Sequence, residues 1–461
     1  MKYFIRILFF ALLLQAFAGC HLERIDALNV ECPNPPVANF TVSTTSISLS
    51  ESIVITNLSD PDAATYDWDF GNGETSKDFN ASTSVTYNTA GTHEIILIVT
   101  DAEGCSATTR KTITVANELK FKTVLNLGSF GGIPLGAVER SDGQFHCLYN
   151  QSGIIKSVVM NPMNIDVTPS PVTIPVDINP NIASAHEGGF IVAGSKGNLA
   201  KVAVIGANQQ KTNIEKEFQF TGASSSSAWG PVMNSTDEVI CTGYRNNSNQ
   251  FIPGLARISS SNSVTSPSVN NSNLNNYGGL SVVEQAGAAG NYYIAATKLN
   301  PYGGSASLLV SVSQSGIYGS HSSLAPITVA YKIMHLSGST YVVVGSDNNS
   351  GKQYLIVVKP GGNQTWSLNM MTAVSDVCIS NSDPSKVVVL GTAGNALGMA
   401  QINLSTGVAD WDEFYSLADG SITGISIAPT SDGGYLTGGH YNHGGKNDFY
   451  LIKTNSTGKA E

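Results

Sequence analysis

Hydrophobic and polar positions alternate over long stretches of the chain with the two-residue period that is typical of β-strands. Between residues 118 and 461 one pattern recurs: a glycine or acidic turn, a short aromatic or aliphatic run, and usually a small residue. Successive repeats are 45 to 53 residues apart, a period typical of the four-stranded blades of a β-propeller. We therefore predict a seven-bladed β-propeller. One aromatic or aliphatic residue at the equivalent position of each run, here called the repeat mark, aligns the seven repeats: Phe145, Phe190, Val239, Tyr292, Tyr341, Val387 and Tyr435.

The two ends of this repeat region predict how the ring closes. The seventh repeat has only three strand patterns before Glu461, and the segment Leu119–Leu127 has the alternation of the missing fourth strand. We expect this N-terminal strand to pair into the last blade, which would leave the ring without an open edge. A generic all-β repeat and two packed sandwiches are the alternatives.

Residues 37–116 carry a separate set of short strand patterns, with turn residues at the intervals of a sandwich and no helical periodicity. Two motifs stand out there, YDWDFGNG at Tyr66–Gly73 and YNTAGTHEIILIV at Tyr87–Val99. Together they resemble the PKD domain, an Ig-like β-sandwich frequent in bacterial surface proteins. We expect Trp68 and Phe70 to point into its core. The complete fold prediction is all-β, a PKD sandwich followed by the propeller.

The cysteines and histidines give no sign of a metal site. The six cysteines form no CxxC pair, so neither a zinc site nor a thioredoxin-like site is predicted. His440 and His443 form an HxxH, which we expect to be a solvated pair because a third ligand would have to come from another blade. We expect turn or edge roles, rather than cation binding, for three residues of the first unit, Asp67, Asp69 and Asn72.

Cys32 precedes the first strand of the 37–116 unit, and Cys105 lies in the turn before its last strand. A disulfide between them and two free thiols are both compatible with the sequence, and an oxidising compartment favours the disulfide. The other three cysteines of the folded region lie in apolar strand patterns and are predicted to be buried free thiols: Cys147, Cys241 and Cys378.

A short leader opens the chain. Lys2 and Arg6 precede the apolar run Ile7–Leu14, and Phe17-Ala18-Gly19-Cys20 follows. This end resembles the lipobox of a bacterial lipoprotein signal peptide, with Phe17 where that family has Leu, Val or Ile. The resemblance implies removal of residues 1–19, a lipid on Cys20, a linker over 20–36, and a protein anchored to the membrane at the bacterial outer membrane or cell surface. A plain secretory signal peptide and an uncleaved anchor are the alternatives.

Composition narrows the classes of partner and chemistry. Charged residues make up 13% of the chain, the formal net charge is −10, and no Lys/Arg block occurs, so we do not expect nucleic acid as a partner. Neither a GxSxG motif nor a recurring carboxylate pair singles out catalytic residues. We therefore predict no catalytic residue, no metal and no cofactor.

The turns between the second and third strands of the blades are rich in Asn, Tyr, Arg and His. These side chains can stack and form hydrogen bonds, which suits a glycan or a protein ligand, although ordinary hairpin turns have similar compositions. The predicted function is a surface-tethered, non-catalytic binding protein, and the alternative is an exported glycoside hydrolase or lyase acting on polysaccharide. The candidate ligand-binding residues are Tyr244, Arg245, Tyr302, Asn348, His440, Tyr441 and His443.

Overall fold

The chain divides into two compact units, Met1–Asn117 and Glu118–Glu461. In this computed structural model, no α-helix occurs in the described residues, and none of their elements is a helix long and apolar enough to cross a membrane. The predicted signal peptide and Cys20 lie outside the described residues, which are 32, 34–48, 52–59, 65–77, 82–116, 119–128, 131–161, 171–247, 250–267, 274–299, 306–313 and 315–460.

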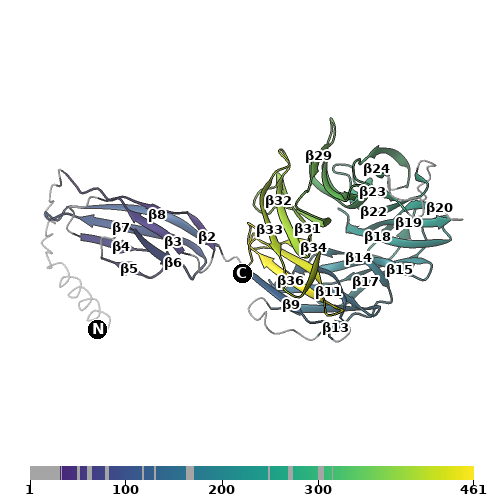
Figure 1. Cartoon of the computed structure of the whole chain (residues 1–461), viewed down its shortest axis with the longest axis horizontal. Coiled ribbons are helices and arrows are strands. Elements are labelled where there is room, and N and C mark those ends of the chain that lie inside the picture. Colours follow the sequence, from purple (N-terminus) through teal and green to yellow (C-terminus); the bar gives the residue numbers. More distant parts are fainter. Residues whose placement is uncertain are drawn as a thin grey trace, which may run out of the picture. The chain divides into compact units, whose positions relative to one another are not determined.

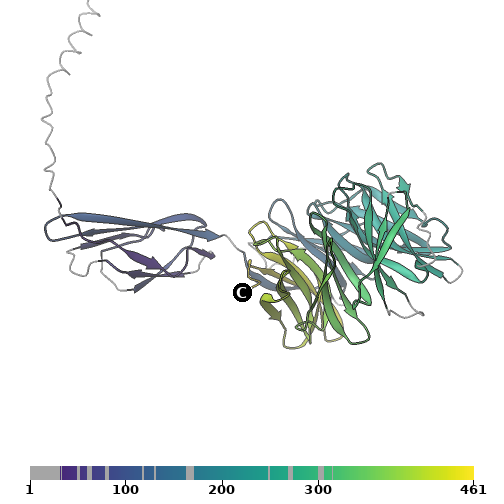
Figure 2. The same ribbon diagram turned by 90° about the horizontal axis from the view of Figure 1, so that it is seen from above.

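The first unit is a sandwich of two sheets, seen as two layers in Figure 2. One sheet has the strand order β1-β3-β6 and the other has the order β2-β8-β7-β4-β5. The strands are β1 (Phe40–Val42), β2 (Ser46–Ser48), β3 (Ser52–Asn57), β4 (Thr65–Asp69), β5 (Thr75–Ser76), β6 (Ser82–Thr86), β7 (Gly91–Thr100) and β8 (Ser106–Ala116).

Side chains from both sheets fill the core of this unit, as the alternating pattern predicts. Trp68 and Phe70 are buried, and the Trp68 ring packs edge-on against Phe40 at 5.3 Å. Gly71 has a φ of +72°, and a Cβ there would lie 2.5 Å from the Glu94 carbonyl oxygen, so the turn after β4 requires glycine. A disulfide joins Cys32 to Cys105 and ties the segment before β1 to the turn between β7 and β8.

The described strands of the second unit form seven four-stranded antiparallel sheets, here called blades 1 to 7. Blade 1 contains β10 (Ile133–Glu139), β11 (Phe145–Gln151), β12 (Ile154–Met160) and β13 (Val172–Thr173), and blade 2 contains β14 (Asn179–His186), β15 (Gly189–Lys196), β16 (Leu199–Ile205) and β17 (Lys211–Phe218). Blade 3 contains β18 (Ser225–Met233), β19 (Val239–Asn247), β20 (Gln250–Ile258) and β21 (Val264–Thr265), and blade 4 contains β22 (Tyr277–Glu284), β23 (Tyr292–Lys298), β24 (Ser307–Val312) and β25 (Tyr318–Ser323). Blade 5 contains β26 (Val329–Ser337), β27 (Thr340–Asp347), β28 (Lys352–Val358) and β29 (Gln364–Ser367), and blade 6 contains β30 (Ala373–Ile379), β31 (Lys386–Ala393), β32 (Ala396–Asn403) and β33 (Ala409–Tyr415). Blade 7 contains β34 (Gly420–Pro429), β35 (Tyr435–His443), β36 (Lys446–Thr454) and β9 (Phe121–Leu125).

The first strand of each blade contacts the first strands of its two neighbours, and β34 contacts β10, so the sheets follow one another around a closed ring (Figure 1). Each of the seven repeat marks lies at or next to the start of the second strand of its blade, as predicted. The strand β9 pairs with β36, with Leu125 opposite Phe449 and Phe121 opposite Lys453. The second unit is therefore a β-propeller closed by its N-terminal strand.

Every first strand contains a β-bulge, and at three of the junctions a hydrogen bond near the bulge joins one blade to the next. The register of all seven first strands shifts near the middle of the strand. Just after the bulge, the Ile333 N–H donates to Ser281 Oγ (3.2 Å), the Ile427 N–H to Asp376 Oδ2 (3.0 Å), and the Ala137 N–H to Ser426 Oγ (3.2 Å). In each case a side-chain oxygen of the neighbouring blade accepts from a backbone N–H close to the bulge, where the sheet ladder is interrupted.

The propeller has two ends that differ in which turns they carry. We call the end with the turns between second and third strands the hairpin face, and the end with the turns between first and second and between third and fourth strands the opposite face. Three cysteines lie within the blades as free, buried thiols, as predicted, and burial raises the pKa of each: Cys147, Cys241 and Cys378.

Candidate functional site: the hairpin face of the propeller

Most candidate residues on the hairpin face belong to strands, not to loops as the sequence analysis expected. Tyr244 and Arg245 lie in β19, which extends to Asn247, and β20 resumes at Gln250. Likewise β35 includes all three candidates of blade 7 and runs to His443, and β36 begins at Lys446. The polar side chains near each turn leave the ladder hydrogen bonds intact, so the strands continue almost to the turn. Tyr302 lies outside the described residues.

In blade 3, three aromatic rings lie on one face of the sheet at its hairpin end. The Trp229 and Tyr244 rings are 5.1 Å apart, and the Tyr244 and Phe251 rings are 5.3 Å apart, both edge to face. Trp229 pairs with Thr242, which shares a sheet face with Tyr244. That face is turned towards blade 4, because a Cβ on Gly279 would lie 1.9 Å from Thr242 Oγ1.

All three rings are partly exposed, and we call Trp229, Tyr244 and Phe251 the aromatic surface. Within the described residues, neither the Trp229 indole N–H nor the Tyr244 hydroxyl has a hydrogen-bond partner, and Phe251 supplies a purely apolar ring. Buried Trp and Tyr usually bond their polar atoms, whereas rings with an accessible polar atom are enriched at binding interfaces. The aromatic surface therefore offers stacking area together with two open hydrogen-bonding groups.

Arg245 does not belong to this surface, although it follows Tyr244 in sequence. Neighbouring residues of a strand point to opposite sheet faces, so Arg245 points away from blade 4. It is 5% exposed, and its Nη1 donates to the Thr221 carbonyl oxygen in the connection that precedes β18. Burial lowers the pKa of its guanidinium. Arg245 is thus not the exposed loop residue that the sequence analysis expected, and it anchors the chain that enters the blade.

Asn348 of blade 5 is exposed, but its backbone is held by a local network. Its N–H donates to Thr328 Oγ1 (2.8 Å), and its Oδ1 accepts from Ser346 Oγ (3.1 Å). Thr328 Oγ1 also donates to the Ser346 carbonyl oxygen (3.3 Å). Thr328 therefore fixes the turn against the connection from blade 4, and the Asn348 side chain marks the exposed tip.

The candidates of blade 7 form an internal cluster. The Tyr441 and His443 rings are stacked at 4.2 Å, and the Tyr441 hydroxyl donates to Asp419 Oδ1. His443 Nε2 lies 2.8 Å from Asp448 Oδ2, and Asp448 Oδ1 accepts the Leu127 N–H at 2.8 Å. Tyr441 is 5% exposed, lies in β35 and belongs to the core between blades 6 and 7, so it is not the exposed loop residue that the sequence analysis expected.

Asp448 gives this cluster its electrostatic character. Burial by itself raises the pKa of its carboxyl, but the hydrogen bonds from the Leu127 N–H and His443, together with nearby Lys446, outweigh burial. The pKa of Asp448 therefore lies below its ordinary value, and the group is ionised at neutral pH. We call Leu127, Tyr441, His443 and Asp448 the closing corner, because Leu127 directly follows the closing strand β9.

His440 lies on the other side of β35 from Tyr441 and His443, because their positions differ by odd numbers. Its Nε2 is buried and has no hydrogen-bond partner. Burial lowers the pKa of His440, and a hydrogen bond with Asn447 offsets part of that effect. His440 and His443 therefore face different blades. They are partly buried rather than a solvated pair, and no group of three metal-ligating side chains occurs among the described residues.

Comparison with known proteins bears on the first unit most directly. Residues 33–116 match the family described as PKD domain. The PKD1 domain of the Vibrio cholerae metalloprotease PrtV is 38% identical, covering 18% of this chain and 98% of that domain, with a TM-score of 0.15. Residues 33–116 are a PKD domain. The turn glycine and the buried Trp68 and Phe70 described above are features of this PKD domain.

Two solved structures also align with most of the chain. A virginiamycin B lyase from Staphylococcus aureus, solved with quinupristin, is 12% identical over 72% of this chain and 98% of the lyase, with a TM-score of 0.48. A putative 6-phosphogluconolactonase from Bacteroides fragilis is 10% identical over 77% of this chain and 96% of its own length, with a TM-score of 0.41.

Sequence reasoning missed two of the three rings of the aromatic surface. Phe251 follows Tyr244 by seven residues, after the hairpin turn, and Trp229 lies in the first strand, fifteen residues before Tyr244. The signal that finds them is cross-strand register: Phe251 is opposite Asn246, and Trp229 is opposite Thr242. Tyr244 lies between these two pairs on the same sheet face, so all three rings meet there.

Proposed function

We propose that this protein is an exported, non-catalytic binding protein of the bacterial surface, whose propeller presents the aromatic surface of blade 3 to a glycan or a surface protein. The observation that carries the proposal is the aromatic surface, because its rings are partly exposed and its Trp229 and Tyr244 polar atoms are open. The PKD domain with its Cys32–Cys105 disulfide supports an oxidising, extracytoplasmic location.

A glycan is the ligand class that the aromatic surface favours. The apolar C–H face of a sugar ring packs against an aromatic ring, and sugar hydroxyls bond both to an indole N–H and to a phenol. The rings stand on three strands that pair with one another, β18 with β19 and β19 with β20, so their spacing is fixed before the ligand arrives. Binding to uncharged rings should depend little on salt.

We further propose that Cys20 carries the lipid, that residues 20–36 link it to the PKD domain, and that the PKD domain separates the propeller from the membrane. Two or more acyl chains give stable anchoring. Changing Cys20→Ala should release the protein from the membrane fraction and abolish labelling with a fatty acid. Membrane retention of the variant with unchanged labelling would refute the lipid anchor and leave the propeller proposal untouched.

The ligand test uses the released Cys20→Ala protein on a glycan array, followed by titration of any bound glycan. We expect Tyr244→Ala to weaken binding by at least tenfold, and Tyr244→Phe to weaken it less because the ring stays. The matched control is Phe414→Ala, which removes a ring that is 45% exposed on the outer strand of blade 6. Equal affinity of wild type and Tyr244→Ala would place the site elsewhere. Conversion of a bound glycan to products would favour the hydrolase or lyase alternative.

A further inference from the structure

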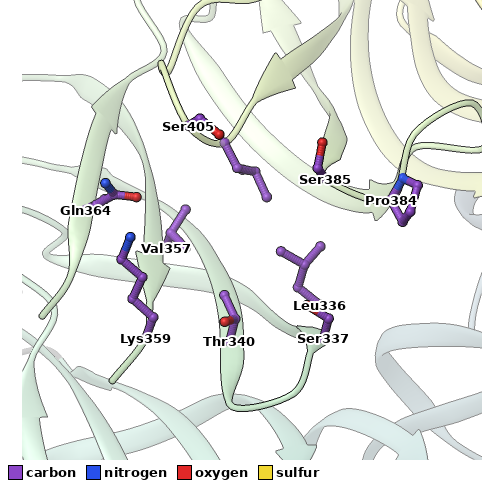
Figure 3. A pocket seen from close by; sticks show the side chains of 10 residues that line it. Leu336, Ser337, Thr340, Val357, Lys359, Gln364, Pro384, Ser385 and Ser405 are labelled. Atoms are coloured by element: carbon purple, nitrogen blue, oxygen red, sulfur yellow. The ribbon is translucent and has the colours of Figure 1, made fainter. Parts of the chain in front are cut away.

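We propose that a groove between blades 5 and 6 on the opposite face of the propeller binds a small organic anion, a molecule with an apolar body and one acidic group. This inference does not rest on the proposed function, because the groove and the aromatic surface lie at opposite ends of the blades. Four turns build the groove: β26–β27 and β28–β29 of blade 5, and β30–β31 and β32–β33 of blade 6. Figure 3 shows their side chains arranged around one opening.

The size of the groove fits a small molecule. Its volume is about 530 Å³, within the range of roughly 300 to 1,000 Å³ that ligand pockets have. Its floor is apolar, since Val357 and Leu404 are buried in the core shared by the two blades and Leu336 packs against that core. An apolar body placed there would cover the exposed part of Leu336 and lose contact with water.

The rim supplies hydrogen-bonding groups around this floor. Hydroxyls of Ser337, Thr340 and Ser405 line the groove with the Gln364 amide. These groups fix orientation without adding charge, the usual role of the few polar groups in an apolar pocket.

The charge of the groove comes from one residue. Lys359 is exposed on the blade 5 side, and among the described residues it makes no ion pair. Asp383, beside the groove in the β30–β31 turn, is already engaged: it accepts from the Ser385 hydroxyl (2.7 Å) and lies 3.3 Å from Lys386. Asp410 pairs with the same Lys386 at 3.0 Å. Asp383 and Asp410 therefore share Lys386 on the blade 6 side of the groove, which leaves the Lys359 ammonium as the charge at the groove that makes no ion pair within the described residues. An acidic group placed beside Lys359 would supply that missing pair, so the groove favours an anion at this side.

The test uses two fluorescent probes that differ in charge. 8-Anilinonaphthalene-1-sulfonate has an apolar ring system and one sulfonate, whereas N-phenyl-1-naphthylamine has the same rings and no charge. Wild type should bind the sulfonate probe saturably at one site and more tightly than the neutral probe. Lys359→Gln should weaken sulfonate binding about three- to fivefold, the size expected for one exposed charge pair, and leave the neutral probe unchanged. Ser405→Trp, which fills the mouth of the groove, should weaken both probes.

Lys352→Gln is the matched control, since it removes the same charge from an exposed lysine at the hairpin end of the same strand β28. It should bind both probes like wild type. Equal sulfonate affinity of Lys359→Gln and wild type would overturn the proposal, as would an equal loss in Lys352→Gln. Loss of the probe signal in Tyr244→Ala would show that the probe reports on the aromatic surface, and would also overturn it.

Discussion

Tyr244 in blade 3 and His440 in blade 7 both lie five residues after their repeat marks, near the hairpin face, yet their surroundings differ. In blade 3 the second strand continues into a third and fourth strand of the same chain segment, and Tyr244 stays partly exposed with an open hydroxyl. In blade 7 the fourth strand comes from the other end of the unit, and His440 has a buried, unpartnered Nε2.

The difference follows from how the closing strand β9 is held in blade 7. Six blades are built from consecutive strands, whereas β9 enters blade 7 without a hairpin to hold it. Two carboxylates hold its flanks instead: Asp432 accepts the Leu119 N–H (2.9 Å) and Asp448 accepts the Leu127 N–H (2.8 Å). Lys453, 1% exposed, pairs with Asp432 at 2.8 Å. Polar residues at both ends of blade 7 therefore hold the closing strand, whereas Tyr244 of blade 3 keeps a hydroxyl without a partner among the described residues.

The largest effect should follow loss of the closing strand. Replacing residues 119–127 by a flexible Gly-Ser segment of equal length removes Phe121 and Leu125 from the core and uncovers Phe449 and Leu451. Each lost side chain costs about 2 to 5 kcal/mol, so we expect the melting temperature of the propeller to fall by roughly 10 °C or more in calorimetry. A wild-type melting temperature would show that β9 does not close the ring.

A smaller loss should follow removal of one carboxylate. Asp448→Ala leaves the Leu127 N–H without its acceptor, which should lower the free energy of unfolding by about 1 to 3 kcal/mol in denaturant titrations. Asp448→Asn should lose less, since its amide oxygen can still accept that N–H. The control is Asp410→Ala, whose carboxylate is 35% exposed and should matter by less than about 1 kcal/mol. Equal effects of the two alanine variants would contradict the role of the closing corner.

The same carboxylates predict a pH dependence. Burial raises the pKa of both Asp432 and Asp448, but hydrogen bonds and nearby Lys or His outweigh it, so both pKa values are lowered in the folded protein. A lowered carboxyl pKa gives stability that is complete above the unfolded value of about 3.9 and is lost as pH falls through the folded value. The stability of wild type should therefore fall below about pH 4, and more steeply than that of the Asp432→Asn/Asp448→Asn double variant. Parallel pH profiles would contradict this account.

The smallest effects should come from the exposed tips of the hairpin face. Asn348→Ala should change the free energy of unfolding by less than about 0.5 kcal/mol, because the side chain is exposed. Thr328→Val should cost about 1 kcal/mol, because it removes the oxygen that bonds both the Asn348 N–H and the Ser346 carbonyl. In thermal melts, Thr328→Val should lower the melting temperature more than Asn348→Ala does. A larger loss in Asn348→Ala would show that residues other than Thr328 hold the turn.

The sequence was sufficient for the architecture because period and composition are local. Phe145 and the other six marks recur at the blade period, and Tyr66–Gly73 identified the sandwich of the first unit. The site depends on pairings that local pattern does not contain. Asp448 acts on the N–H of Leu127, 321 residues away, and Arg245 turns from Tyr244 because β19 continues past both. Polar residues near a turn give the same sequence pattern whether they bind a ligand or form hydrogen bonds with other parts of the chain.

We expect the aromatic surface of blade 3, and not the closing corner of blade 7, to bind the ligand. The direct measurement is calorimetric titration of an array-identified glycan into wild type, Tyr244→Ala and Tyr441→Phe, each with the melting temperature recorded. Tyr441→Phe removes only the hydroxyl that bonds Asp419. We expect Tyr244→Ala to bind at least tenfold more weakly at a melting temperature close to that of wild type, and Tyr441→Phe to keep its affinity with a lower melting temperature. Unchanged affinity in Tyr244→Ala together with lost binding in Tyr441→Phe would contradict this expectation.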